Sequence, residues 1–237
     1  MRMQLPARDN ISALSHVPLF TRLSREELQA LGLRIRLRSF RAGEIIFHRN
    51  DPGDTFYVIL RGVVKIFLSS EEGQEVVLII LKEGEFMGEL SLIDGEPRSA
   101  SALALEATDT LTIDRDSLLD FIGEHPKAAL NIFAVIASRF RRADGVIADC
   151  AFLDLHTRLN KMLVELVKQF GRRRGGATEI DLRLSQRDLA SMVSSTRESV
   201  NRLLVGLEDE GIVRLDRQRI TVLRLDLLEE RTHQLSM

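Results

Sequence analysis

The chain lacks the residues that disulfide-stabilised and cluster-binding proteins need. Of its 237 residues only one, Cys150, is cysteine, and none is tryptophan. One cysteine excludes an internal disulfide framework and any iron–sulfur or multi-cysteine metal site supplied by a single chain. No apolar run approaches the ~20 residues of a membrane span, and no apolar core follows the first residues as in a secretory signal. We therefore expect a cytoplasmic protein without a membrane segment.

Catalytic constellations are lacking as well. No Ser/His/Asp, paired-carboxylate or metal-ligand cluster emerges from the sequence. The histidines are scattered along the chain: His16, His48, His125, His156 and His233. We expect no enzyme activity, no bound metal and no prosthetic group.

Neither sign of charge is in large excess, but positive and negative residues are unevenly distributed along the chain. The formal net charge is −2. Residues 1–154 contain 18 Lys and Arg against 23 Asp and Glu, whereas residues 155–237 contain 15 against 12. A modestly basic C-terminal part is compatible with nucleic acid, although the excess alone does not establish such binding.

Short β-branched and aliphatic runs occupy the region from Ile35 to Ile113, and glycine-bearing turns separate them. The turns recur roughly every ten residues, which is typical of an antiparallel sandwich or barrel. Ahead of this region, residues 19–33 are expected to form a short amphipathic helix with Ser24 as its N-cap.

The string FMGELSL at residues 86–92, followed by GEPRSA at residues 95–100, interrupts the strand pattern. Arg98 can bind a phosphate through two parallel hydrogen bonds. Glu89 can accept a hydrogen bond from a sugar hydroxyl, and Gly88 lets backbone N–H groups approach an anion closely. A small sugar phosphate suits this pair, and the string resembles the phosphate-binding cassette of cyclic nucleotide-binding domains.

A heptad pattern follows Pro126. Its seam, with alternating steps of three and four residues, consists of Leu130, Phe133, Ala137, Phe140, Asp144, Ile147 and Ala151. A long helix with such a seam usually pairs with another helix, so we expect self-association through residues 126–150. Packing of the same stripe on the chain's own strands is the alternative.

Two helices and a hairpin are expected near the C-terminus. They follow a helix over residues 155–170 and an arginine-rich loop over residues 172–176, which is expected to be solvated, with contact to phosphates as the alternative. Residues 185–188 resemble a capping box that opens the first short helix. A second helix is expected over residues 197–207, and residues 212–223 form a β-hairpin. This order predicts a winged helix-turn-helix.

One face of that second helix is aliphatic, and the opposite face carries polar side chains that suit base edges. These candidate readers are Arg197, Glu198, Asn201 and Arg202. Arginine matches the O6/N7 edge of guanine, and glutamate can accept from cytosine N4. Arg217 and Arg219 in the hairpin are expected to contact phosphates. A plain amphipathic helix with a solvated charged face is the alternative.

In combination these strings resemble the CRP/FNR family of bacterial transcription regulators, and within it the cyclic AMP receptor branch, over residues 19–223. The likeness is carried by GEL at residues 88–90, RSA at 98–100, AFLD at 151–154 and TRESVNR at 196–202. It implies an α+β fold with an N-terminal β-roll (a double-stranded β-helix of the cyclic nucleotide-binding type), a long dimerisation helix and a C-terminal winged helix-turn-helix. These parts would occupy residues 1–125, 126–150 and 151–237.

The resemblance also implies roles for individual residues. Glu89 would bind the ribose hydroxyl. Arg98 and Ser99 would bind the cyclic phosphate, with backbone help from Gly88 and Leu90. Arg139 would lie near the phosphate and Glu89. Arg197, Glu198 and Arg202 would read a TGTGA-like half-site, repeated as an inverted palindrome. The implied protein is a homodimeric, allosteric DNA-binding regulator that also contacts RNA polymerase.

The chain departs from the cyclic AMP branch at three positions. Ala143 and Asp144 stand where that branch offers a Thr–Ser pair to the adenine. A carboxylate accepts hydrogen bonds, so Asp144 can take the amine of adenine or the N1–H and N2–H of guanine. Cyclic AMP is favoured as effector, with cyclic GMP, or DNA binding without any cyclic nucleotide, as alternatives. Ser194 replaces a frequent glycine in the turn, so either the turn differs or Ser194 is strained.

Overall fold

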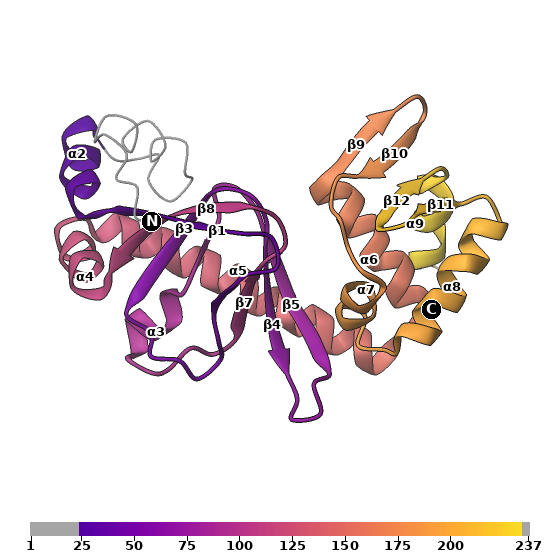
Figure 1. Cartoon of the computed structure of the whole chain (residues 1–237), viewed down its shortest axis with the longest axis horizontal. Coiled ribbons are helices and arrows are strands. Elements are labelled where there is room, and N and C mark those ends of the chain that lie inside the picture. Colours follow the sequence, from indigo (N-terminus) through magenta and orange to yellow (C-terminus); the bar gives the residue numbers. More distant parts are fainter. Residues whose placement is uncertain (1–23, 234–237) are drawn as a thin grey trace. The chain divides into compact units, whose positions relative to one another are not determined.

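The computed structural model describes residues 24–233, and the chain divides into two compact units (Figure 1). The first contains Met1–Leu68 and Leu78–Phe140, and the second contains Ser69–Val77 and Arg141–Met237. The division falls inside the long helix α5, so the domain boundaries expected after residues 125 and 150 stay a prediction.

Among the described residues up to Asp114, eight short strands form two four-stranded sheets, and the turn spacing predicts such an antiparallel arrangement. Their orders are β1-β8-β3-β6 and β2-β7-β4-β5, and the pairs β1–β8, β3–β8 and β4–β7 are antiparallel. The strands are β1 Arg36–Phe40, β2 Ile45–Phe47, β3 Thr55–Arg61, β4 Val64–Ser69, β5 Glu75–Leu81, β6 Phe86–Met87, β7 Ser101–Ala104 and β8 Thr108–Asp114.

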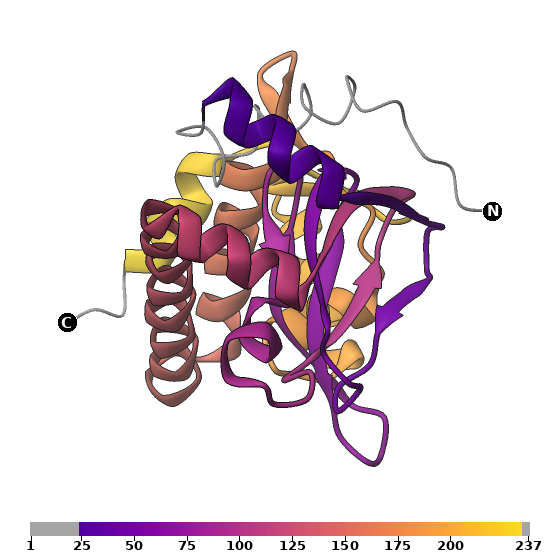
Figure 2. The ribbon, with the colours of Figure 1, turned by 90° about the vertical axis from the view of Figure 1, so that its left-hand side faces the viewer.

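Strand β3 is buried on both faces. Alternate side chains of a strand point to opposite sides, so consecutive residues of β3 enter different core clusters. Phe56 and Val58 belong to one core cluster, which also takes Leu118 from helix α4. Tyr57 and Ile59 belong to the second cluster, between the two sheets. The first cluster therefore lies under the helices, and Figure 2 shows α2 and α4 against the strands.

A side-chain cap begins two of the helices in this part of the chain, α2 and α4. The helices are α2 Arg25–Arg34, α3 Glu89–Asp94, α4 Arg115–Glu124 and α5 Pro126–Phe152. Ser24 and Glu27 form a capping box at α2, which confirms the expected N-cap, while residues 19–23 lie outside the described residues. Helix α5 begins at Pro126, as predicted, and ends two residues beyond the expected residue 150.

The second unit contains four helices and a four-stranded sheet in the order β11-β12-β10-β9, counted over the described residues after 154. Its elements are α6 Leu155–Phe170, β9 Gly171–Arg174, β10 Ala177–Ile180, α7 Gln186–Met192, α8 Arg197–Asp209, β11 Val213–Asp216, β12 Arg219–Val222 and α9 Leu225–His233. Helices α6 and α9 pack together, and Leu159, Leu163 and Leu228 are fully buried. The expected helix-turn-helix and its β-hairpin are both present.

The arginine-rich segment after α6 is a strand, so the expectation of a solvated loop over residues 172–176 is wrong for its first three residues. Strand β9 pairs antiparallel with β10. Gly175 and Gly176 both have positive φ angles, 55° and 89°. Two such residues form the tight two-residue turn that matches the twist of a hairpin, so the chain returns on itself immediately.

Candidate functional site

The glycine-bearing cassette holds a buried arginine beside a buried glutamate. Arg98 is 3% exposed, and its Nη1 donates to the carbonyl oxygen of Gly88 at 2.9 Å while its Nη2 donates to that of Thr55 at 2.6 Å. Gly88 has φ 84°, and a Cβ there would lie 2.6 Å from Arg98 Nη1. Only glycine fits this position, because the space and the left-handed backbone both exclude a side chain.

Arg98 keeps one buried nitrogen, Nε, without a hydrogen-bond partner. The guanidinium lies over the ring of Phe47 at 4.5 Å and that of Tyr57 at 5.8 Å, and burial lowers the pKa of Arg98 from its ordinary value. Among the described residues it has no ion pair. A buried cation with an open donor is complementary to an anion.

Glu89 presents the opposite chemistry at the start of α3. It is 4% exposed, and its Oε1 accepts from Arg139 Nη1 at 2.9 Å. Arg139 comes from α5 and also donates to the Phe86 carbonyl oxygen at 2.5 Å. Oε2 of Glu89 is buried without a partner. The carboxylate therefore retains one free acceptor, which suits a hydroxyl group.

The remaining residues expected at the cassette lie at its surface or outside its unit. Leu90 and Ser99 are exposed neighbours of Glu89 and Arg98. Ala143 and Asp144 are exposed residues of α5 and belong to the second unit. The structure thus brings together Gly88, Glu89, Arg98 and Arg139 in the first unit, whereas Ala143 and Asp144 belong to the second.

Helix α5 has two apolar faces. Ala128 and Ile132 are buried in the first core cluster. The expected seam is exposed to solvent, with exposed fractions of 67% for Leu130, 54% for Phe133, 69% for Phe140 and 67% for Ile147. Its smaller members Ala137, Asp144 and Ala151 are exposed as well. The alternative in which this stripe packs on the chain's own strands is therefore wrong.

Side chains cap both helices of the helix-turn-helix, and the capping box expected at residues 185–188 is present. Ser185 and Asp188 form a capping box at α7, and the Thr196 side chain accepts from the backbone N–H of Ser199 at α8. Ser194, in the turn between them, has φ 51°. Serine therefore occupies the strained left-handed conformation that glycine adopts more easily.

The recognition face of α8 is divided by burial as the helical wheel predicts. Val200 and Leu204 are buried, whereas Arg197, Glu198 and Arg202 are exposed. Asn201 is half-buried and is bonded to Gln186 of α7. Sequence reasoning missed Gln186, because nothing in its local pattern indicates a contact with a helix eleven or more residues away.

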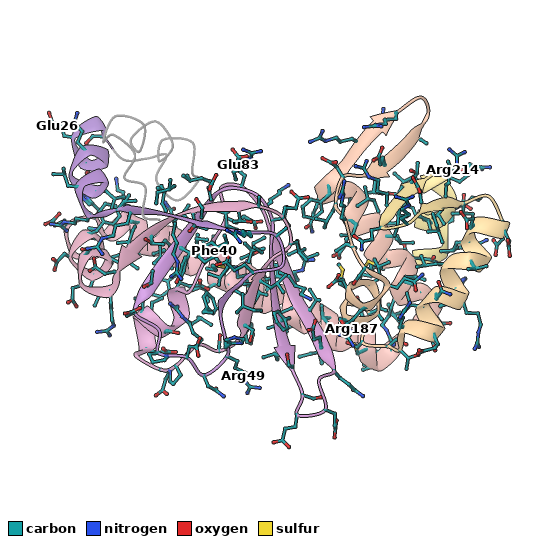
Figure 3. The ribbon with its side chains drawn as sticks, in the orientation of Figure 1. Glu26, Phe40, Arg49, Glu83, Arg187 and Arg214 are labelled. Carbon is teal, nitrogen blue, oxygen red and sulfur yellow. The ribbon has the colours of Figure 1, made fainter. Side chains whose placement is uncertain are left out.

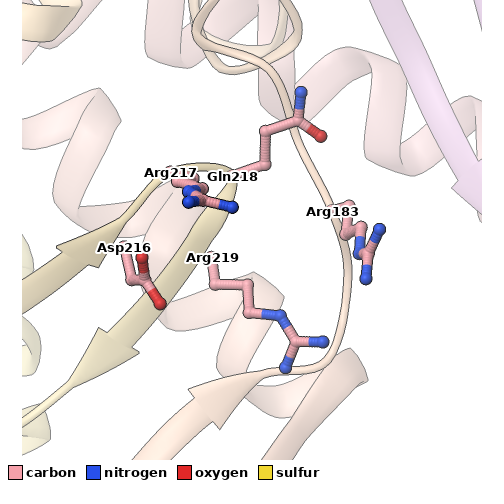
Figure 4. Close-up of a pocket in the computed structure, with 5 residues that line it drawn as sticks. All are labelled: Arg183, Asp216, Arg217, Gln218 and Arg219. Carbon is pink, nitrogen blue, oxygen red and sulfur yellow. The ribbon is translucent and has the colours of Figure 1, made fainter.

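Arginines also line a pocket of about 450 Å³ at the tip of the β11–β12 hairpin (Figure 4). Its lining residues are Arg183, Asp216, Arg217, Gln218 and Arg219. Arg219 donates to Glu179 Oε1 at 2.5 Å, and Arg174 also bonds Glu179, so part of the positive charge is neutralised. Arg183, which sequence reasoning missed, has no ion pair among the described residues.

Further cations extend from this unit, and Figure 3 labels two of them, Arg187 of α7 and Arg214 of β11. Both are exposed. Over residues 24–233, no three His, Cys, Asp or Glu side chains are placed to hold a metal ion. In the same range none of the helices combines the length and apolar character needed to cross a membrane.

Two family models match the chain. The cyclic nucleotide-binding domain matches residues 37–125, and the Crp-like helix-turn-helix domain matches residues 157–231. The two matches together cover the strand region with the cassette and the region with the capped helix pair and its hairpin.

Curated proteins similar to the chain are transcriptional regulators. A CRP-like cAMP-activated global transcriptional regulator of Mycobacterium tuberculosis is 31% identical over 209 residues, which are 88% of this chain and 93% of the relative. The cyclic AMP receptor protein of Thermus thermophilus is 34% identical over 213 residues, 90% and 95% of the two chains.

Solved structures show the same fold. The c-di-GMP responsive global regulator CLP of Xanthomonas campestris has a TM-score of 0.75 at 22% identity, covering 84% of this chain and 99% of that one. The catabolite activator protein of Thermus thermophilus has a TM-score of 0.51 at 34% identity, covering 92% and 100%.

Proposed function

The chain belongs to the CRP/FNR family of transcription regulators, and from that premise we propose that it is a homodimer whose DNA binding is controlled by a cyclic nucleotide. It is a DNA-binding regulator with a cyclic nucleotide-binding domain, and its curated relatives are regulators rather than enzymes. We propose the identity of its effector, its pairing with a second copy of the chain and the DNA sequence that it recognises.

The observation that carries the effector proposal is a pair of buried, unpartnered atoms of opposite character. Glu89 Oε2 is an acceptor and Arg98 Nε is a donor, and both belong to the cassette around Gly88. A ribose hydroxyl and a cyclic phosphate supply the two missing partners in one small molecule. Ser99, and the backbone N–H groups of Gly88 and Leu90, would complete the phosphate contacts.

Cyclic AMP is the favoured effector, and cyclic GMP is the alternative. Two relatives above 30% identity are named for cyclic AMP, whereas the c-di-GMP responsive protein is 22% identical and supports the fold alone. Asp144 would accept a hydrogen bond from the amine of the base, and Ala143 would offer no side-chain hydrogen bond to it.

The bare seam of α5 supports a second copy of this chain as partner. Leu130, Phe133, Phe140 and Ile147 are each more than half exposed. Full burial of such a side chain is worth about 1.5–3 kcal/mol, so an unpaired row is costly in water. The matching seam of a second α5 would cover it in a parallel pair.

DNA would be read by α8 and held by the hairpin. Arg197, Glu198 and Arg202 would contact bases of a TGTGA-like half-site, and the dimer would place two half-sites about one helical turn apart. Arg183 and Arg217, with Arg219 at the same pocket, would contact phosphates without reading sequence. Such a regulator would act in the cytoplasm beside RNA polymerase.

Arg139 offers a route from effector to DNA. It bonds Glu89 from α5, so a ligand that competes for the Glu89 carboxylate changes what holds this helix. A ligand that binds one arrangement of α5 better shifts the population toward it. The alternative, a regulator without a cyclic nucleotide, is favoured only by Arg98 already having both terminal nitrogens bonded.

Calorimetry of the full chain with cyclic AMP, cyclic GMP and c-di-GMP tests the proposal, alongside DNA binding measured by fluorescence anisotropy on a TGTGA inverted repeat. We expect heat with one cyclic mononucleotide, tighter DNA binding in its presence, and loss of both in Arg98→Ala. The exposed Arg49→Ala is the control. No heat with any nucleotide, together with unchanged DNA binding, would favour the effector-independent alternative.

A further inference from the structure

Gln186, the first residue of α7, bridges two residues of α8. Its Oε1 accepts from Arg197 Nε at 3.2 Å, and its Nε2 donates to Asn201 Oδ1 at 2.6 Å. These bonds span 11 and 15 positions of the chain. One side-chain amide therefore holds two candidate base readers of the other helix.

We propose that Gln186 is a positioning residue that determines which base edges α8 selects. This inference rests on the proposed function, because it assumes that α8 reads DNA. The guanidinium of Arg197 has donors only, so the oxygen of Gln186 must face it. The amide nitrogen then faces Asn201, whose oxygen must accept. The orientations of both amides follow from the charge of Arg197.

The bridge leaves Arg197 with one way to meet a base. Its Nε is engaged by Gln186, so Nη1 and Nη2 remain as a parallel pair of donors. Such a fork matches the O6 and N7 acceptors of guanine. Because the side chain is already held, less rotamer freedom is lost when it binds. We expect Arg197 to select guanine end-on.

The same bridge restricts Asn201 to one hydrogen-bonding character. Its Oδ1 accepts from Gln186, so the Nδ2 hydrogens are what it offers outward. These donors favour acceptor edges, such as N7 of a purine or O4 of thymine, over the N4 amine of cytosine. Asn201 would otherwise be able to present either end of its amide.

Replacement by glutamate separates the two bonds. In Gln186→Glu the carboxylate still accepts from Arg197 but has no hydrogen to donate to Asn201. Asn201 must then turn its own Nδ2 toward Glu, which leaves Oδ1 facing outward as an acceptor. We expect the guanine preference at Arg197 to remain, while the base opposite Asn201 shifts toward cytosine or adenine, whose amines donate.

The test is selection from random-sequence DNA by the full chain, with and without cyclic AMP and cyclic GMP, followed by relative affinities for single-base variants of the selected site. Gln186→Ala should reduce guanine discrimination at the Arg197 position by about fivefold while leaving affinity for random DNA unchanged. Gln186→Glu should change preference at the Asn201 position alone. Gln74→Ala, an exposed glutamine on the β4–β5 turn, is the matched control.

Two results would overturn the inference while the proposed function stands: a wild-type base profile in both Gln186 variants, or an equal loss of affinity for every sequence. The second is what a purely structural role in α7 would produce, and thermal unfolding of each variant identifies it. A wild-type chain that selects no sequence overturns the proposed DNA reading, and this inference with it. If Gln186→Ala does not fold, the profile of Gln186→Glu decides.

Discussion

Arg139 Nη1 lies 2.9 Å from Glu89 Oε1, and the other oxygen of that carboxylate, Oε2, is buried without a partner. The side chains are 22% and 6% exposed, so water screens the pair only weakly. A charge on the long helix thus compensates a buried carboxylate on α3 while leaving it one acceptor to offer.

Removal of Arg139 should destabilise the first unit. Arg139→Ala leaves the Glu89 charge buried and unpaired, which we expect to lower the free energy of unfolding by about 2–4 kcal/mol. Urea unfolding measures this loss. Adding Glu89→Gln should recover most of it, because the buried charge is then gone. Arg141→Ala, which removes an exposed arginine from the same helix, should change stability little.

Gly88→Ala should lower the stability of the fold more than Gly95→Ala. Both glycines have positive φ, 84° and 77°, so an alanine at either costs about 1–2 kcal/mol in backbone strain. At Gly95 a Cβ meets nothing within 4 Å, whereas at Gly88 it lies 2.9 Å from the Thr55 carbonyl oxygen. Thermal unfolding should show a larger fall in the unfolding temperature for Gly88→Ala. Equal falls would show that Arg98 and Thr55 can move away from the added methyl group without loss of stability.

Charge in the α5 seam should prevent self-association. Phe140 is 69% exposed in the single chain, and Phe140→Asp would bring two carboxylates together if α5 pairs with a second copy. Sedimentation should then show a dimer for the wild type and a monomer for the variant. Leu119→Asp, at an exposed position of α4 away from the seam, should remain dimeric. A monomeric wild type would contradict the proposed partner.

Arg202 and Arg217 should affect DNA binding in different ways. Arg202→Ala should cost about 1–3 kcal/mol of discrimination at one base, because the residue lies on the exposed face of α8. Arg217→Ala should weaken binding to all sequences and reduce the salt slope by about one. Anisotropy titrations at several salt concentrations, with specific and random DNA, distinguish the two. An unchanged specificity ratio in Arg202→Ala would move the reading face elsewhere.

The start of α6 should lose stability in acid. The Asp154 carboxylate accepts from the Thr157 N–H at 2.8 Å, and this bond holds the pKa of Asp154 below its ordinary value. A lowered folded-state pKa stabilises above the unfolded value, about 3.9, and the benefit disappears as pH falls through the folded pKa. Asp154→Ala should cost about 1 kcal/mol at pH 7. The difference from wild type in thermal unfolding should shrink below about pH 4.

Local signals explain what the sequence could predict. Ser24, Ser185 and Thr196 cap helices through bonds three residues away, so their patterns are legible in the chain itself. The bare seam of α5 follows from a simple period. Strand β9 was not predictable, because GRRR has no alternation and the strand it pairs with, β10, lies beyond the turn.

Long-range partners explain the rest. Gln186 contacts residues 11 and 15 positions away, and Arg183 lines a pocket with residues of the β11–β12 turn, which are distant from it in the sequence. Arg139 and Glu89 are 50 residues apart, and only the family resemblance suggested their contact. The unpartnered atoms Glu89 Oε2 and Arg98 Nε come from packing, which no periodicity records.

The carbonyl oxygens of Thr55 and Gly88 already fix the terminal nitrogens of Arg98, at 2.6 and 2.9 Å. The Arg98 side chain is thus preorganised, so a ligand that binds it would cause little further loss of side-chain conformational entropy. Differences in affinity among related ligands then reside in how long each remains bound. If the proposed effector binds here, its residence time, more than its rate of arrival, would set how long the regulator stays active.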